Sequence, residues 1–253
     1  MRRTEPTPAS SGIFGDDPPD AFDAERPNRW APTFDAIARV FRHEVRGLEH
    51  IPRQGPALLV LNHGPYPVDA VLLCRALHRD VGRWPRFLGE KLIFERPAVG
   101  ERLARWGVVE GTPYQARRRF LAGDLVGVFP GGSREAWKPH TQRRQLLWEG
   151  RDGFARVAFK SNVPIIPVAS PAADDLVWVL NDAMGWGERV LGARRRLPLP
   201  VVLGLGLLPF PVKLVHVIGA PIVPERRAGE TSEDAVQRIK RDTQAALEAL
   251  LTG

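Results

Sequence analysis

Short, uninterrupted apolar runs alternate with helical segments along this chain. Apolar runs typical of buried strands lie at 57–61, 124–129, 164–168 and 214–218. Amphipathic spacing or helix start signals mark segments at 30–44, 68–78, 112–121, 152–161 and 232–250. Continuous apolar strands need helices on both faces of their sheet. The alternation therefore predicts an α/β fold, a single domain with a largely parallel or mixed sheet flanked by helices.

Local signals refine this expectation between the strands. Residues 44–61 read as strand, turn and strand, residues 87–106 as helical, and 108–109 as a short strand. Thr112 followed by Pro113 is a strong helix start, with threonine as N-cap and proline in the first turn. Ser232 is the expected cap of the last helix.

The domain boundary is expected near residue 30. Residues 1–28 are rich in Pro, Asp, Ser and Glu and hold few large apolar side chains. We therefore expect a disordered or loosely attached arm at 1–30 and one domain at 31–253. A chain of 253 residues can bury a sizeable core. The single cysteine, Cys74, excludes an internal disulfide framework.

The charge balance narrows the class of partner. The formal net charge is +7, and arginine carries nearly all of the positive charge. Anionic membranes and phosphorylated small molecules are candidate partners. A nucleic-acid partner is not expected, because the arginines are scattered and no reading motif accompanies them. The apolar run 197–212 holds four prolines and two glycines, so a spanning helix is not expected. With no secretory signal at 1–20, we expect a cytoplasmic protein.

The stretch LNHGPYPVD at 61–69 holds the first candidate for chemistry. His63 follows an apolar run, and in α/β sheets ligands bind where strands end. Asp69 opens the next helix and can reach back to the imidazole, fixing one tautomer and leaving the other nitrogen as a base. The alternative is an ordinary turn whose aspartate only stabilises the start of the helix.

A second candidate is FPGGSRE at 129–135, which also follows an apolar run. Glycines leave backbone N–H groups open to an anion, and Arg134 adds a fixed charge. The alternative is a tight turn with a surface pair between Arg134 and Glu135.

Together these stretches resemble the glycerolipid acyltransferase superfamily. The similar blocks are at 44–63, 129–135, 163–168 and 218–222, and the likeness extends over roughly 35–250. This chain departs from the common pattern of the superfamily at two places, and in both it resembles the branch of type-2 diacylglycerol acyltransferases. Five residues rather than four separate His63 from Asp69, and Gly131 stands where the common block has glutamate.

The resemblance implies acyl transfer from acyl-CoA or acyl carrier protein to an alcohol, with no further cofactor. His63 would be the general base and Asp69 its orienting partner. Substrate binding would fall to residues of the two blocks: Asn62, Gly131, Gly132, Ser133, Arg134 and Glu135. The remaining histidines show no metal-ligand spacing, so no metal site is predicted.

The sequence leaves two classes of lipid as possible acceptors of the acyl group. Glu110, in the place where phosphate-using relatives have arginine, and Gly131, which leaves room for an uncharged chain, favour a neutral alcohol such as mono- or diacylglycerol. A lysophospholipid acceptor is the alternative, with Arg134 and the cluster Arg117, Arg118 and Arg119 reading its phosphate. A non-catalytic lipid-binding protein of the same fold is the third possibility.

A membrane surface is the expected partner of the segment near residue 195. Arg194, Arg195 and Arg196 precede the apolar run 197–212, and Trp178 and Trp186 lie nearby in sequence. Basic residues beside apolar and aromatic ones suit a bilayer interface, so peripheral association with the inner face of the membrane is expected. The alternative is a proline-rich loop packed on the core.

Overall fold

The computed structural model describes residues 20–192, 197–205 and 208–253. Within them, a seven-stranded sheet has the order β1-β9-β6-β2-β5-β3-β4. Its strands are β1 (Glu44–Arg46), β2 (Ala57–Leu61), β3 (Arg86–Gly89), β4 (Val109–Glu110), β5 (Leu125–Val128), β6 (Ile165–Ala169) and β9 (Val215–Ile218). The five strands from β6 to β4 run parallel, whereas β9 is antiparallel to β6 and parallel to β1. The predicted α/β class with a mixed, largely parallel sheet is confirmed.

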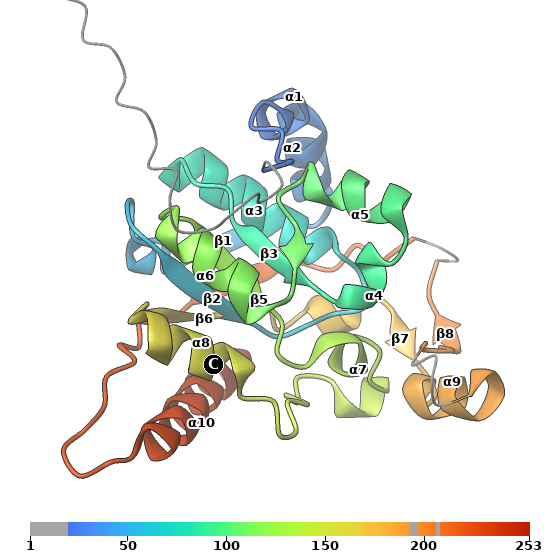
Figure 1. Cartoon of the computed structure of the whole chain (residues 1–253). Helices are drawn as coiled ribbons and strands as arrows, with labels where there is room; N and C mark the ends of the chain where they lie inside the picture. Colours follow the sequence, from blue (N-terminus) through green and yellow to red (C-terminus); the bar gives the residue numbers. More distant parts are fainter. Residues whose placement is uncertain (1–19, 193–196, 206–207) are drawn as a thin grey trace, which may run out of the picture.

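Helices cover both faces of this sheet (Figure 1). The helices of the described residues are α1 (Arg26–Arg29), α2 (Ala31–Val40), α3 (Val68–Val81), α4 (Lys91–Phe94), α5 (Pro97–Ala104), α6 (Pro113–Leu121), α7 (Gly132–Ala136), α8 (Gly153–Ser161), α9 (Ala183–Leu191), which stands beside the sheet, and α10 (Ser232–Thr252). Short 3-10 turns lie at η1 (Leu48–His50), η2 (His140–Gln142) and η3 (Ala173–Asp175).

The central strand β2 shows how the core divides between the two faces. Leu58 and Val60 join a cluster with α6, α8 and α10, whereas Leu59 and Leu61 join one with α3. Successive side chains of a strand point to opposite faces, so a fully buried strand must be apolar throughout. This requirement explains the run Ala57–Leu61, in which all five residues are buried.

One predicted element is wrong. Residues 87–106 form strand β3 followed by the short helices α4 and α5, and not a single helix. Phe87 pairs with Gly127 of β5, and a Cβ on that glycine would collide with the Phe87 ring. Pro97 begins α5, since proline suits a first turn and breaks a helix interior. The cap of α10 also shifts by one residue, because Thr231 forms a capping box with Asp234.

The chain is attached to the domain before residue 30, which corrects the predicted arm for residues 20–30. The Asp20 carboxylate accepts hydrogen bonds from Arg86, at 2.8 Å, and from Arg119, at 2.6 Å. The Arg86 guanidinium lies over the Phe22 ring, 3.8 Å from its centroid. Arg119 is buried and also pairs with Asp124, so it is neither a solvated residue nor a phosphate ligand. Residues 1–19 lie outside the described residues.

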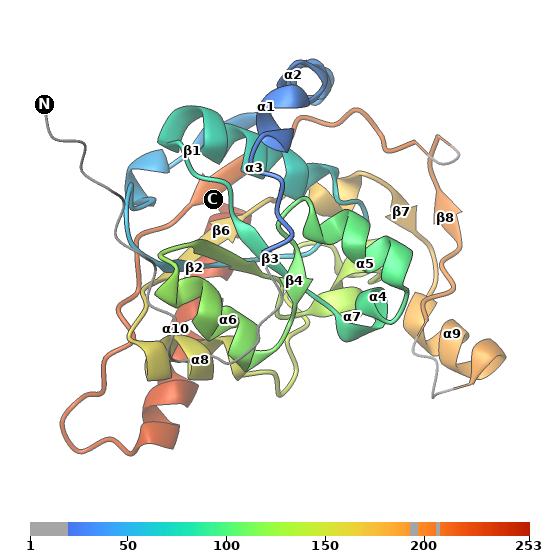
Figure 2. The same ribbon diagram turned by 45° about the horizontal axis from the view of Figure 1, so that its top comes forward.

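A small extension stands beside the sheet. It consists of α9 and a two-stranded antiparallel sheet of β7 (Trp178–Val179) and β8 (Val202–Leu203). Figures 1 and 2 both show these elements beyond α7, on the side away from α6, α8 and α10. The sequence did not predict α9, β7 or β8, since two-residue strands carry no periodic signal.

Candidate active site

The carboxyl ends of four parallel strands bring the candidate residues together. His63 follows β2, Phe129 follows β5, Ser170 follows β6 and Glu90 follows β3. Carboxyl ends of neighbouring parallel strands share one edge of the sheet, where ligands bind in open α/β folds. The two sequence blocks predicted to carry chemistry therefore meet at this edge.

The imidazole of His63 stacks on the Phe129 ring, with centroids 4.3 Å apart and planes 25° apart. Its Nδ1 atom is buried without a hydrogen-bond partner among the described residues. Burial lowers the pKa of His63 to about 4; the Glu90 carboxylate opposes this shift, and the Lys138 ammonium adds to it. The ring is therefore neutral at pH 7 and able to accept a proton.

Asp69 does not hydrogen-bond to His63. It lies 3% exposed in the first turn of α3, where its Oδ1 atom accepts from the Ala70 N–H at 2.8 Å. Burial raises the pKa of Asp69 to about 7, and the nearby Asp174 carboxylate adds to the shift. The expected direct contact between the two side chains is absent, and an orienting role for Asp69 stays a prediction.

A different carboxylate holds the backbone of His63. Glu135 is fully buried; its Oε1 atom accepts from the His63 N–H and its Oε2 atom from the Leu147 N–H, both at 2.8 Å. Its side chain cannot reach a substrate, which corrects the predicted binding role. A Cβ on Gly131 would collide with Glu135, so this glycine makes room for a buried carboxylate and not for an acceptor.

Asn62 has a structural role and not the predicted substrate contact. It is 2% exposed, its Nδ2 atom donates to the Ser170 carbonyl at 3.0 Å, and its Oδ1 atom accepts from the Ser170 N–H at 2.7 Å. This pair of bonds ties the end of β2 to the end of β6. The position of His63 is thus set by bonds from both neighbouring strands.

Two residues that the sequence analysis missed hold the glycine turn from outside. The Glu90 carboxylate accepts from both the N–H and the hydroxyl of Ser133, each at 2.8 Å. Arg151 donates from Nη1 to the Pro130 carbonyl at 3.1 Å, and also to the Gly131 carbonyl. Glu90 was missed because β3 was read as helix, which removed it from the strand ends.

The Gly132 backbone lies between these two side chains. It has φ +53°, a left-handed conformation that favours glycine, and a Cβ there would lie 2.6 Å from Glu90 Oε1. Its N–H donates to the Phe129 carbonyl within the turn. The Gly132 N–H is therefore already bonded and is not open to an oxyanion as predicted, and the neighbouring Ser133 N–H is bonded to Glu90.

Arg134 lies in α7, directly after this turn. It is exposed and forms an ion pair with Glu149, which raises the pKa of Arg134. With Lys138 and Asp182 it lines a polar hollow between α7 and the start of α9. Arg134 thus lines a different hollow from the cavity that holds Phe129, the stacking partner of His63, although the two blocks were expected to act on one substrate.

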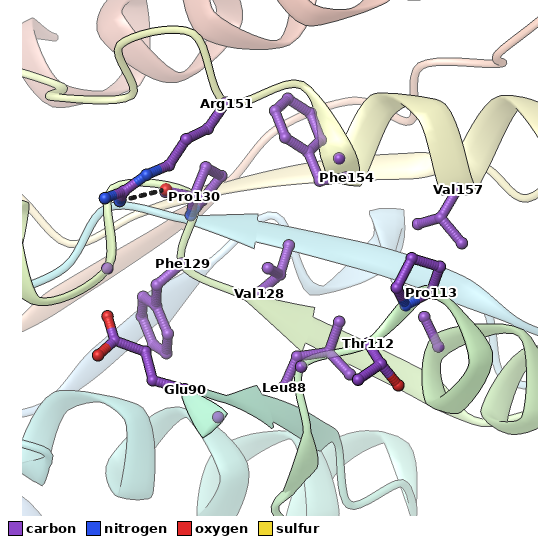
Figure 3. A pocket seen from close by; sticks show the side chains of 15 residues that line it. Leu88, Glu90, Thr112, Pro113, Val128, Phe129, Pro130, Arg151, Phe154 and Val157 are labelled. Atoms are coloured by element: carbon purple, nitrogen blue, oxygen red, sulfur yellow. Dashed lines mark hydrogen bonds between the residues drawn. The ribbon is translucent and has the colours of Figure 1, made fainter. Parts of the chain in front are cut away.

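An apolar cavity of about 320 Å³ opens between β3, β5, α6 and α8. Its walls include Leu88, Ala116, Val128, Phe154 and Val157. Figure 3 shows Glu90, Phe129 and Arg151 on one side of the cavity and Pro113 and Val157 on the other. Its polar end includes Phe129, whose ring stacks on His63, and His63 itself lies behind this ring and does not line the cavity.

The extension carries exposed apolar side chains. Trp178, Leu180, Trp186, Val190, Val201, Val202, Leu203, Leu205 and Leu208 are between 41% and 69% exposed. Arg194, Arg195 and Arg196 lie outside the described residues. Across the described part of the chain, no helix has the length and apolar character needed to cross a bilayer, and no group of three His, Cys, Asp or Glu side chains could hold a metal ion.

Comparison with known proteins decides the family. A family model described as Acyltransferase matches residues 42–170, which include the blocks at 61–69 and 129–135. The chain belongs to this acyltransferase family. Its membership confirms the resemblance drawn from the motifs at 44–63 and 129–135.

Individual relatives of this acyltransferase occur in bacteria and in mammals. An uncharacterized protein of Mycobacterium tuberculosis (strain H37Rv) is 30% identical over 229 residues, covering 84% of this chain and 63% of the relative. The human DGAT1/2-independent enzyme synthesizing storage lipids is 29% identical, covering 86% of this chain and 65% of the relative. The chain thus spans less than two thirds of the length of these relatives. The crystal structure of the 1-acyl-sn-glycerophosphate (LPA) acyltransferase PlsC from Thermotoga maritima shares the fold, with a TM-score of 0.52 and 18% identity over 90% of this chain and 83% of PlsC.

Proposed function

We propose that this acyltransferase moves a fatty acyl group from an acyl thioester to the hydroxyl of a neutral lipid alcohol. The observation that carries the proposal is the neutral imidazole of His63, stacked on Phe129 beside an apolar cavity. A general base must be unprotonated and near the reacting hydroxyl, and an acyl chain needs an apolar wall. Family membership supports the reaction type.

In the proposed step, the acyl chain lies along Leu88 and Val128, and its thioester carbonyl reaches the His63 end of the cavity. The acceptor oxygen attacks this carbonyl while His63 takes the hydroxyl proton. The carbon–oxygen bond forms, the carbon–sulfur bond breaks, and the thiolate leaves with the proton from the imidazolium. Acyl-CoA or acyl carrier protein supplies the thioester, and no further cofactor takes part.

The proposed acceptor is a mono- or diacylglycerol or a long-chain alcohol. The name of the human relative, an enzyme synthesizing storage lipids, supports this class. The name of PlsC favours lysophosphatidate instead, but that protein shares only the fold with this chain. A lipid-binding protein without catalysis is a weaker candidate, because a neutral imidazole, able to act as a base, is stacked on a residue of the cavity wall.

We further propose that the extension contacts a membrane from which the acceptor is drawn. Trp178 on β7, Trp186 and Val190 on α9, and Val202 and Leu203 on β8 are exposed, and arginines at 194–196 follow α9 in the sequence. Apolar area with nearby cations suits an anionic bilayer surface. Met184 at the start of α9 lines the hollow beside α7, so this surface adjoins the catalytic turn.

The test is an acyl-transfer assay on purified protein, with acyl-CoA and acyl carrier protein as donors and a panel of alcohols as acceptors. His63→Ala should lower the turnover rate by at least about 100-fold while the circular dichroism spectrum stays unchanged. Wild-type turnover in the folded variant would remove the mechanism. Absence of transfer to every acceptor by the wild-type protein would remove the proposed activity.

A further inference from the structure

Glu90 occupies the donors that an anionic substrate would use at the glycine turn. Its two carboxylate oxygens take the Ser133 N–H and the Ser133 hydroxyl, each at 2.8 Å. A strand end followed by glycines and a helix start is a common anion-binding arrangement, because consecutive N–H groups point outward. Here the protein supplies the anion itself.

The cations around this turn are also engaged. Arg151 is bonded to the Pro130 and Gly131 carbonyls. Arg134 is paired with Glu149, and the Lys138 ammonium lies 2.9 Å from the buried Asp174 carboxylate. Among the described residues that line the cavity or the polar hollow beside α7, each cation therefore has a carboxylate or carbonyl partner within the protein.

From these contacts we propose that Glu90 sets the acceptor class, by rejecting acceptors whose headgroup carries a phosphate. The inference rests on the proposed function, since it concerns the acceptor in that reaction. A phosphate monoester carries nearly two negative charges at pH 7 and needs well-placed cations when it leaves water. Beside Glu90 it would meet a like charge that already holds the Ser133 donors, whereas an uncharged glycerol headgroup meets no such repulsion.

The position of Glu90 makes this repulsion direct. Glu90 is exposed to solvent and lines the cavity, so a headgroup can reach it. Its charge also acts on His63, because the carboxylate raises the pKa of His63 against the effect of burial. A headgroup close enough to His63 for proton transfer is therefore within the field of Glu90.

The test compares Glu90→Gln with Glu95→Gln. The first replacement keeps an oxygen acceptor for the Ser133 N–H and removes the charge. The second removes the same charge from an exposed residue of the neighbouring turn, where no bond to the catalytic turn exists. For each protein, kcat/KM is measured with monoacylglycerol and with lysophosphatidate of the same acyl chain, presented in the same neutral micelles.

Glu90→Gln should lower the ratio of the two specificity constants, neutral over phosphorylated, by at least about tenfold, and Glu95→Gln should leave it within twofold. An unchanged ratio in Glu90→Gln would overturn the inference while the proposed function stands. A wild-type preference for lysophosphatidate would overturn both.

A binding measurement tests the role of Glu90 without depending on acyl transfer. Lysophosphatidate affinity, followed by tryptophan fluorescence, should rise about tenfold in Glu90→Gln and stay constant in Glu95→Gln, whether or not the preparation transfers acyl groups. A rise without any turnover would support the inference and count against the proposed activity. Equal affinity in the wild-type protein and Glu90→Gln would contradict the role of Glu90.

Discussion

A base with a pKa near 4 is a weak base, but it is unprotonated throughout the physiological range. His63 reaches this state because its ring is packed on Phe129 and its Nδ1 atom is buried. Glu135 fixes the backbone of the same residue, and Asn62 fixes the strand end before it. The candidate base is thus positioned by its own main chain, in addition to any contact of the ring.

The pH profile should reflect this burial. A base is competent above its pKa, so a folded-state value of about 4 keeps His63 active as the pH falls through 6.5, where a solvated histidine would be half protonated. We expect kcat/KM to show no inflection near pH 6.5 in the variant Asp69→Asn, which removes the buried carboxyl whose pKa is raised to about 7. An inflection near 6.5 in that variant would mean that substrate-free His63 is solvated.

Glu135 should contribute to the free energy of unfolding, because both of its carboxylate oxygens accept hydrogen bonds from backbone N–H groups. Glu135→Gln replaces one of two acceptor oxygens with an NH₂ group, which must then face the N–H of His63 or of Leu147. A buried donor left without an acceptor costs about 1–3 kcal/mol. We expect urea unfolding to show a loss of that size, with Glu149→Gln, at an exposed ion pair, losing under about 1 kcal/mol. Equal losses of stability in the two variants would contradict a structural role for the two hydrogen bonds that Glu135 accepts.

For individual residues, the sequence predicted which ones lie close together, but not which of their polar atoms remain available to a substrate. Strand ends placed His63 beside the turn at 129–135 correctly. The bonds of Asn62 and Glu135 to backbone groups far along the chain depend on tertiary packing, which no local pattern records. Substrate binding was therefore assigned to two side chains that the fold uses internally.

Among elements, continuous apolar runs were predicted well and short strands poorly. The run at 57–61 became β2, because only a fully buried strand needs five apolar residues in succession. Strand β3 was lost because Phe87 and Leu88 continue into residues of high helix propensity, and only the pairing with β5 decides the conformation. The loss of β3 also concealed Glu90, the residue on which acceptor choice is proposed to depend.

The extension of β7, α9 and β8 should bind vesicles through its apolar side chains. We expect the triple variant W186S/V190S/L203S to pellet with phosphatidylglycerol-containing liposomes several-fold less than the wild-type protein. Leu121→Ser, a replacement of an equally exposed residue on α6, should bind as the wild type does. Added salt should weaken wild-type binding, since part of the attraction is electrostatic. Equal pelleting of the triple variant would assign membrane contact to another surface.

For the whole molecule, the two outermost strands on one side of the sheet are joined by a pair of histidines, of which His216 is buried and His43 half-buried. His43 Nε2 lies 2.9 Å from His216 Nδ1, which joins the residue before β1 to the middle of β9. Burial lowers the pKa of His43 to about 4 and that of His216 to about 3; Arg79 adds to the shift at His43, and Glu44 opposes it. At pH 7 both rings in the folded protein are therefore neutral imidazoles, each with one N–H group.

This pair should make the fold sensitive to acid. In the unfolded chain both rings bind a proton near pH 6.5, whereas the folded rings do not until about pH 4 or below, so unfolding takes up protons and stability falls as the pH drops between these values. Each such proton contributes a slope of about 1.4 kcal/mol per pH unit. The free energy of unfolding of the wild-type protein should therefore fall more steeply from pH 6.5 to 4 than that of H43N/H216N.

The comparison with the double variant is needed because other groups titrate in the opposite sense. Burial raises the pKa values of Asp69 and Glu135, so these carboxyls hold protons more strongly in the fold and stabilise it as the pH falls. Both proteins share that contribution, and it cancels in the difference between their slopes. Urea titrations at half-unit intervals measure this difference. Parallel curves for the two proteins would mean that the folded pair takes up protons as readily as the unfolded chain, and that burial between β1 and β9 does not lower the pKa values of these rings.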